Sequence, residues 1–188
     1  MIVAVLGWFG SILYLVNHGY ISVNKEWKPN IYFTGNLIAA LALVASSLLI
    51  SSYQAVVING FWALISILLI IKFDMSTIAF SKRAFYLGLI LILAWSAYIA
   101  YKHGINSLAF FTYLGWSSSY VFCLSYFLFC SKKLNRISYL LLNAFAASAL
   151  LPILWRQENW PVFSLEICWV LISIYGAYTQ VDEVHLID

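Results

Sequence analysis

Charge is what this sequence has least of. Only 9% of its 188 residues are Asp, Glu, Lys or Arg, against about a quarter in a typical soluble domain. Hydrophobic residues make up 64% of the chain, and the mean hydropathy is +0.91. A chain this poor in charge is excluded from the ordinary soluble class, and its small net charge of +3 gives no basis for binding nucleic acid. The composition predicts an integral membrane protein.

The groups that build metal centres and active sites are also scarce. Cys123, Cys130 and Cys168 all fall within apolar runs, where buried free thiols are the usual outcome. The three histidines lie far apart in the sequence. We find no nucleophile–base pair, no metal-ligand spacing and no phosphate-binding loop, and the loops are short. We therefore expect no cofactor, no metal and no enzymatic activity.

Seven apolar runs are each of a length to cross a bilayer as a helix, which takes about 20 residues. Segments this long and this apolar exceed the strands of a membrane barrel, so a helical bundle is expected. The expected spans are residues 2–17, 31–51, 55–71, 84–101, 108–130, 137–154 and 162–178. The predicted fold class is all-α integral membrane, with seven transmembrane helices.

The basic residues of the loops predict the orientation of these helices. With the N-terminus outside, the outer loops hold only Lys102 and Arg156. Cytoplasmic loops carry an excess of Lys and Arg, so this distribution predicts N-out and C-in. The remaining basic residues then all fall in inner loops: Lys25, Lys28, Lys72, Lys82, Arg83, Lys132, Lys133 and Arg136.

An internal repeat runs through the chain. Trp62, Leu64, Ile65 and Ser66 recur 107 residues later as Trp169, Leu171, Ile172 and Ser173. The same offset relates residues 36–43 to 143–150, and an offset of 108 relates Leu6-Gly7-Trp8 to Leu114-Gly115-Trp116. Matches at a shared offset across three separate apolar runs indicate two copies of one unit.

The span at residues 84–101 has no counterpart in either copy. A single linker helix between two sets of three helices gives both sets the same orientation, so the copies are expected to be parallel. A pseudo-twofold axis along the membrane normal would relate them. The predicted organisation is a first three-helix repeat at 1–73, a linker with its helix at 74–104, a second repeat at 105–180 and an acidic tail at 181–188.

The copies differ most where Asn59 of the first copy becomes Glu166 of the second. Glu166 is the only acidic residue deep in an apolar run. A carboxylate at a helix centre costs roughly 2.5–3.5 kcal/mol on insertion scales, so it is expected to face the bundle interior or a water-filled cavity. There it could carry a proton or pair with a cationic solute. Alternatively, it could hydrogen-bond a neighbouring helix and serve packing alone.

Further polar and aromatic residues are candidates for lining a pocket between the copies. The tryptophans follow Asn59 and Glu166 by three residues and share their helix face, where they could hold a flat ring or a cation. Each candidate could equally serve helix packing alone. The full candidate set for solute binding is Asn36, Asn59, Trp62, Asn143, Glu166 and Trp169.

A three-plus-one-plus-three arrangement in a chain this small resembles the SWEET sugar transporters, their half-size SemiSWEET relatives and the Pnu-type vitamin-precursor transporters. Ile58-Asn59-Gly60 is similar to the position at which the SWEET family places an Asn against its substrate, whereas Glu166 departs from that pattern. Ser173-Ile174-Tyr175-Gly176 is similar to a stretch in the last span of Pnu-type proteins. These resemblances imply a solute site between the copies.

A closer likeness is to a small bacterial three-span family of unknown function. Its second span bears an Asn, and a short turn leads from there into an Asn-x-x-Trp third span, as at Asn36 and Asn59–Trp62. This likeness implies a location in the bacterial inner membrane.

Two functions fit these observations. The first is a transporter or facilitator of a small polar or cationic solute, in which Glu166 acts as a counter-charge or as a proton-coupled switch. The second is a non-transporting scaffold or a subunit of a larger membrane complex. The lipid bilayer surrounds the protein in both cases, and a homo-oligomer or a partner membrane subunit is compatible with each.

Overall fold

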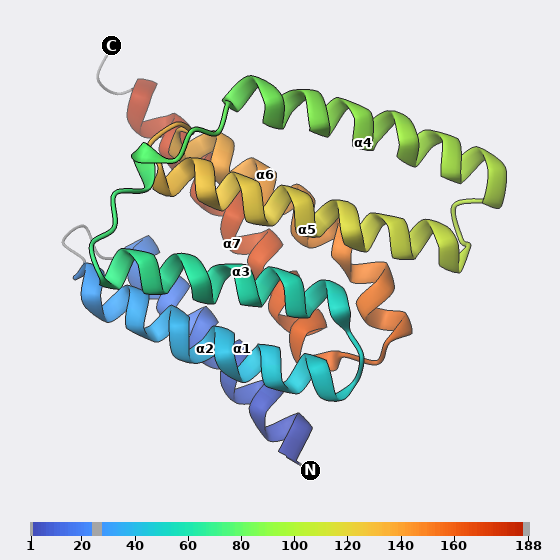
Figure 1. The fold of residues 1–188 in the computed structure, drawn as a ribbon, viewed down its shortest axis with the longest axis horizontal. Helices are drawn as coiled ribbons and strands as arrows, with labels where there is room; N and C mark the ends of the chain where they lie inside the picture. Colours follow the sequence, from blue (N-terminus) through green and yellow to red (C-terminus); the bar gives the residue numbers. More distant parts are fainter. Residues whose placement is uncertain (1, 24–27, 186–188) are drawn as a thin grey trace.

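The computed structural model describes residues 2–23 and 28–185, and these residues are all-helical, as the composition predicts (Figure 1). Seven α-helices and one short 3-10 helix make up the described part of the chain. They are α1 (Ile2–Val23), α2 (Pro29–Leu49), α3 (Tyr53–Ile70), η1 (Met75–Thr77), α4 (Lys82–His103), α5 (Leu108–Cys130), α6 (Arg136–Arg156) and α7 (Trp160–His185).

The helices follow the predicted spans to within about two residues, except at two ends where the difference is larger. α1 continues past its predicted end at residue 17 because Asn17 is buried and hydrogen-bonded to α2, which keeps that turn packed. α7 continues to His185 and so includes residues 181–185 of the predicted tail, where no Gly or Pro interrupts the helix. Residues 186–188 of that tail, and Lys25 of the first inner loop, lie outside the described residues.

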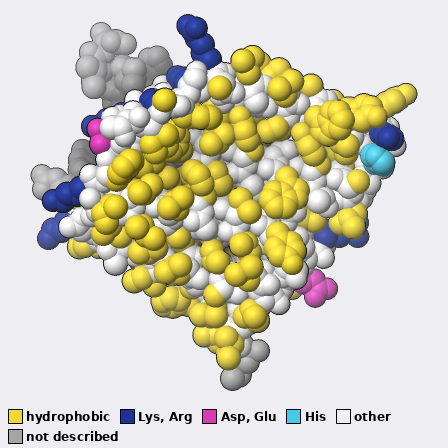
Figure 2. Space-filling model, in the orientation of Figure 1, with side chains coloured by type: hydrophobic (Ala, Val, Ile, Leu, Met, Phe, Trp, Pro, Cys, Tyr) yellow, Lys and Arg dark blue, Asp and Glu magenta, His cyan; other side chains and the backbone are white. Residues whose placement is uncertain are grey.

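Six of the seven helices are long and apolar enough to cross a membrane. The exception is α5, which has 23 residues and no charged side chain, but carries four buried serines. Large apolar side chains are also exposed on the outside of the bundle, among them Leu91 at 69% and Leu171 at 64%. Figure 2 shows hydrophobic side chains spread over one whole face of the molecule. These features identify an integral membrane protein.

The helices pack in two groups that meet along two contacts. α2 packs against α1 and α3, and α6 packs against α5 and α7. The two groups then meet where α1 contacts α7 and where α3 contacts α5. α4 packs mainly against α5 and lies at the outer edge of the bundle (Figure 1).

Small residues allow the central helices of each group to approach their neighbours closely. Ala39 and Ala40 of α2, and Ala146 and Ala147 of α6, have no exposed surface. Where no hydrophobic force drives association, such residues let helix backbones come near enough for dispersion contacts. The two middle helices therefore form the centres of the two groups.

The turns that join α2 to α3 and α6 to α7 have the same geometry. Ser51 and Glu158, which stand at counterpart positions, both have positive φ angles, of 55° and 53°. In each turn the N–H of the next residue donates to the carbonyl oxygen five residues back, at 2.9 and 3.1 Å. The repeat is thus expressed in backbone conformation as well as in sequence.

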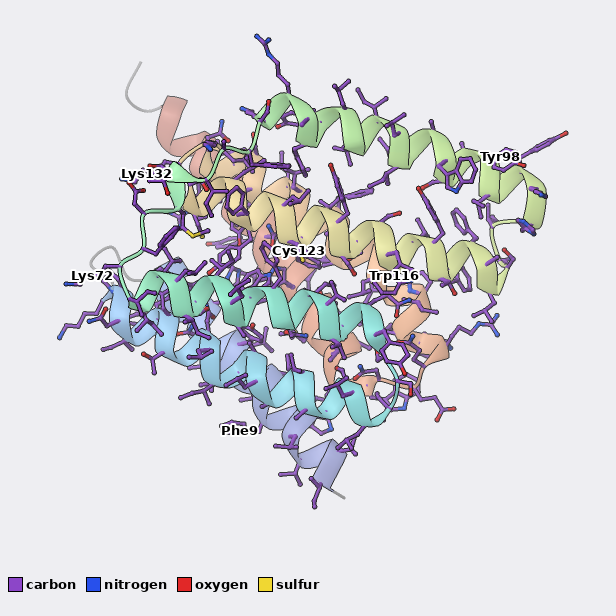
Figure 3. The ribbon with its side chains drawn as sticks, viewed as in Figure 1. Phe9, Lys72, Tyr98, Trp116, Cys123 and Lys132 are labelled. Carbon is purple, nitrogen blue, oxygen red and sulfur yellow. The ribbon has the colours of Figure 1, made fainter. Side chains whose placement is uncertain are left out.

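Basic residues of two connections lie at the same end of the molecule. Lys72 follows α3, Lys132 follows α5, and Figure 3 shows both at that end. Lys133 Nζ donates to the carbonyl oxygen of Ile78 at 2.8 Å, which ties the α5–α6 turn to the α3–α4 connection. The predicted inner loops after α3 and after α5 are therefore neighbours in space.

Candidate functional site

A buried cavity lies where α1, α3, α5 and α7 meet, and its walls are matched in the two copies. Its volume is about 20 Å³, which is room for about one water molecule. Every lining residue has its counterpart, at an offset of 107 or 108, on the opposite wall. The pairs are Tyr14 with Phe122, Ile58 with Leu165, Asn59 with Glu166, and Trp62 with Trp169.

Two buried oxygen atoms of the cavity lining have no hydrogen-bond partner among the described residues. The Nδ2 of Asn59 donates to the carbonyl oxygen of Ala55, one turn earlier on α3, at 2.9 Å. Glu166 is 6% exposed, and its Oε2 has no hydrogen-bond partner among the described residues. The hydroxyl of Tyr14 is likewise buried and without a partner in that part of the chain. Because burying an unpaired polar atom costs free energy, these two oxygens mark where a ligand or water would bind.

Three aromatic rings meet edge to face at the cavity. The ring of Tyr14 lies 5.8 Å from Trp62 and 6.2 Å from Trp169, centroid to centroid. The two tryptophan rings lie 5.5 Å apart at 79°. Such edge-to-face contacts stabilise aromatic pairs by about 0.5–1.5 kcal/mol beyond the area they bury. The rings therefore form a well-packed wall.

Each tryptophan is also stacked against a residue of the other copy. Trp62 stacks on Tyr126 of α5 at 4.1 Å, and Trp169 stacks on His18 of α1 at 4.2 Å. His18 and Tyr126 are themselves counterparts, at an offset of 108. The stacking thus crosses between the copies twice, in matched fashion, and it fixes the orientation of both indoles at the cavity.

Asn36 and Asn143 are both buried, but neither is among the residues that line the cavity. Asn143 Oδ1 accepts a hydrogen bond from the indole N–H of Trp169 at 3.1 Å. Asn36 Oδ1 instead accepts from Asn17 Nδ2 at 2.8 Å. The indole N–H of Trp62 is buried and has no acceptor within the described ranges. Asn143 therefore bonds a tryptophan of the cavity lining, whereas Asn36 bonds Asn17.

Matched hydrogen bonds join the copies beside the cavity. Ser11 of α1 donates to the carbonyl oxygen of Pro161 at 2.9 Å, and Ser119 of α5 donates to that of Gln54 at 3.4 Å. Ser11 and Ser119 are counterparts, as are Gln54 and Pro161. Each bond runs from the first helix of one copy to the start of the third helix of the other.

A polar network adds to this junction. Gln157 Nε2 donates to Gln54 Oε1 at 3.1 Å, and the hydroxyl of Ser52 donates to Gln157 Oε1 at 2.5 Å. Ser52 and Gln157 lie in the turns that precede α3 and α7, and Gln54 lies in the first turn of α3. The network therefore links the copies at one end of the bundle.

The structure brings four of the six candidate residues to the cavity: Asn59, Trp62, Glu166 and Trp169. Asn36 and Asn143 are not among its lining residues. The sequence reasoning missed Tyr14 and Phe122, whose only signal was the offset of 108, because their side chains differ. Within residues 2–23 and 28–185, no three His, Cys, Asp or Glu side chains are grouped to hold a metal ion.

One family model matches the chain in two separate segments, residues 3–76 and 111–183. Together these segments cover well over half the chain. The chain belongs to this uncharacterised family. The first segment contains α1 to α3, the second contains most of α5 to α7, and α4 lies between them, so the match supports a two-part repeat.

The likeness to SWEET and Pnu-type transporters is not shown by the comparisons. No curated protein and no solved structure matches the chain. Membership of the family therefore supports the repeat, and the function has to be argued from the cavity itself.

Proposed function

We propose that this protein is a transporter or facilitator that moves a small solute through the cavity between its two copies. The observation that supports it is the matched lining, to which α1, α3, α5 and α7 each contribute. Transporters built from parallel repeats bind their solute at the repeat interface. A carboxyl group without a partner at that interface gives the solute a polar anchor in Glu166.

In this proposal all seven helices cross the membrane, with α1–α3 and α5–α7 as parallel copies and α4 as their linker. The reciprocal packing of α1 on α7 and α3 on α5 supports it. The orientation is N-out and C-in, because the end that carries Lys72 and Lys132 would then face the cytoplasm (Figure 3). The likeness of Asn36 and Asn59–Trp62 to a bacterial three-span family supports a place in the bacterial inner membrane.

The cavity would open by relative movement of the copies. At about 20 Å³ it is too small for more than a water-sized body, so a larger solute requires the copies to move apart. Packing within each copy is more extensive than packing between them. Each copy would therefore move as a unit, and the network of Ser52, Gln54 and Gln157 would separate when that end opens. Glu166 would hold the solute as a counter-charge or exchange a proton with it.

A second function, a non-transporting scaffold or subunit, is favoured by one observation. α4 packs mainly against α5, and Phe85 is its one buried side chain. Its exposed residues include Leu87 and Ile90, each 62% exposed. In this alternative a partner membrane protein or a second copy of the chain covers α4, and the polar groups at the cavity only join the helices.

Thermal unfolding of the detergent-purified protein separates the two functions. A panel of sugars, nucleosides, vitamin precursors and amines is tested on the wild type, on Glu166→Gln and on Glu158→Gln, which alters an exposed carboxylate in a turn. A ligand that binds only the folded protein raises the midpoint by mass action. Transport predicts a shift that Glu166→Gln abolishes and Glu158→Gln keeps. No shift across the panel, with Glu166→Gln as stable as the wild type, supports the scaffold.

A further inference from the structure

We infer that the cavity at Glu166 takes an ammonium group, either the free ammonium ion or the head of a small amine. This inference names the substrate class of the transport site and so rests on the proposed function.

The charge of the lining selects a cation. Among its eight described residues Glu166 is acidic and none is Lys or Arg. The Oε2 of Glu166 is buried without a partner, and a buried carboxylate needs a cation or hydrogen-bond donors to offset its desolvation. An anion would instead be repelled by this carboxylate. Cationic and donor-bearing ligands are therefore favoured over phosphates, carboxylates and sulfonates.

The aromatic wall favours the same sign of charge. Trp62, Trp169 and Tyr14 surround the cavity with ring centroids 5.5–6.2 Å apart, and Phe122 adds a fourth ring. Cations are attracted to the faces of such rings, most strongly to those of tryptophan. A sugar would bring several hydroxyls to a wall that has few polar atoms to pair with them, and the unpaired hydroxyls would be costly.

The size and the oxygen atoms of the cavity favour ammonium over a metal ion. Three lining side chains offer oxygens: Glu166, Tyr14 and Asn59. Calcium takes about six to eight oxygen ligands and magnesium a near-octahedral set, which three side chains do not supply. An ammonium group is close to a water molecule in size and needs only a few acceptors for its N–H bonds. Because Asn59 Nδ2 is held by Ala55, its Oδ1 remains an acceptor beside the other two.

The pseudo-symmetry of the cavity provides a sharp test of this site. Asn59 and Glu166 are counterparts that line the same cavity, so a carboxylate moved to position 59 still faces the same rings. The variant Asn59→Glu/Glu166→Asn therefore keeps the composition of the cavity and exchanges only the wall that carries the charge. Ammonium binding should be lost in Glu166→Gln and recovered in the exchanged variant.

The experiment titrates the thermal midpoint with ammonium chloride and methylammonium chloride, against sodium and potassium chloride at equal ionic strength. The thermal midpoint of the wild type should rise with the two ammonium salts and not with the sodium or potassium salt. Glu166→Gln should weaken this apparent affinity at least tenfold, and Glu158→Gln should leave it unchanged. Tyr14→Phe, which removes one oxygen and keeps the ring, should weaken it several-fold. If Glu166→Gln does not fold, the exchanged variant and Tyr14→Phe still decide the question.

The inference is overturned if the ammonium salts do not raise the wild-type midpoint, or if Glu166→Gln or Tyr14→Phe keeps full affinity. A second experiment separates ammonium binding from transport. It measures uptake of labelled methylammonium by proteoliposomes, with empty liposomes as the background and Glu166→Gln as the paired control. Ammonium binding without uptake supports the ligand class and contradicts the proposed transport. A midpoint shift and uptake for a neutral solute, with no response to ammonium, would support transport and overturn the ammonium inference.

Discussion

The tryptophans of the two copies have matched stacking partners but different hydrogen bonds. In the second copy Trp169 donates to Asn143. In the first copy the matching Asn36 accepts from Asn17, and the indole N–H of Trp62 has no acceptor in the described part of the chain. The counterpart of Asn17 is Ser125, whose hydroxyl donates back within α5 and leaves Asn143 to the indole.

This difference shows how two copies of one packing arrangement acquire different chemistry. Apolar contacts and turns are shared, while single polar substitutions at Asn17 and at Glu166 change which buried groups are paired. Because an unpaired buried group is costly, each such substitution changes the stability of the copy that carries it. The copies thus share turn geometry and aromatic stacking but differ in polar pairing.

The largest effect is expected from copying a serine of the second copy into the first. In α5, Ser118 donates to the carbonyl oxygen of Ala146 at 2.7 Å. At its counterpart Gly10, a Cβ would already lie 2.8 Å from Leu43 and 2.9 Å from the carbonyl oxygen of Ala39. Gly10→Ser should therefore destabilise the protein by about 3 kcal/mol through overpacking.

The control for that change is Ser118→Ala, which removes one hydrogen bond and should cost about 1 kcal/mol. Both free energies of unfolding are measured in detergent. Equal costs for the two variants would show that α1 approaches α2 no more closely than α5 approaches α6.

A second prediction compares the two asparagines. Asn143→Ala leaves the buried indole N–H of Trp169 unpaired and also removes the bond from Asn143 to the Tyr139 carbonyl oxygen, so we expect a loss of about 2 kcal/mol. Asn36→Ala should cost about half as much, because Asn17 keeps its bond to the Tyr32 carbonyl oxygen at 2.7 Å. The free energies of unfolding decide the comparison, and the reverse order would contradict this assignment of partners.

The repeat behind these two predictions is readable in the sequence, but the polar partners are not. The offset of 107 by itself pairs Asn59 with Glu166 and Trp62 with Trp169, and all four residues line the cavity. Asn36 and Asn143 are predicted to line the same pocket, but neither is among its lining residues, and Asn143 instead accepts a hydrogen bond from the indole of Trp169. Periodicity places a residue on a helix face without saying how deep it lies behind a bulky neighbour.

Some residues at the cavity are not predicted from the sequence, for a different reason. A repeat found from identical residues does not reveal counterpart positions that hold different side chains. Tyr14 with Phe122, and His18 with Tyr126, are such pairs. The extension of α1 past Asn17 accompanies a tertiary hydrogen bond from Asn17 to α2, which local propensity does not encode.

A third prediction converts the first copy to the pairing of the second. Asn17→Ser reproduces Ser125 and frees Asn36 Oδ1 for the indole of Trp62, so the net loss of stability should stay below about 1 kcal/mol. A double-mutant cycle with Asn36→Ala and Trp62→Phe should give no coupling in the wild type and at least about 0.5 kcal/mol in the Asn17→Ser background. Identical coupling in both backgrounds would show that Asn17 does not control the pairing.

A fourth prediction concerns the two serines that join the copies, where a single hydroxyl is removed from each junction. Ser11→Ala should cost about 1 kcal/mol, because its bond to Pro161 is short at 2.9 Å. Ser119→Ala should cost less, because its bond to Gln54 is 3.4 Å and the hydroxyl also donates to Gly115 within α5. The same unfolding measurements rank them, and a larger loss at Ser119 would mean that the α3–α5 contact is the stronger junction.

The matched serine bonds have a consequence for how such a chain can originate. When residue i of one unit contacts residue j of another and j contacts i in return, the surface is self-complementary, as in the isologous interface of a twofold dimer. The pairs Ser11 with Pro161 and Ser119 with Gln54 have this reciprocal form. A single three-helix unit therefore carries both halves of the junction, and two separate chains of that kind could assemble around one cavity before a linking helix joined them.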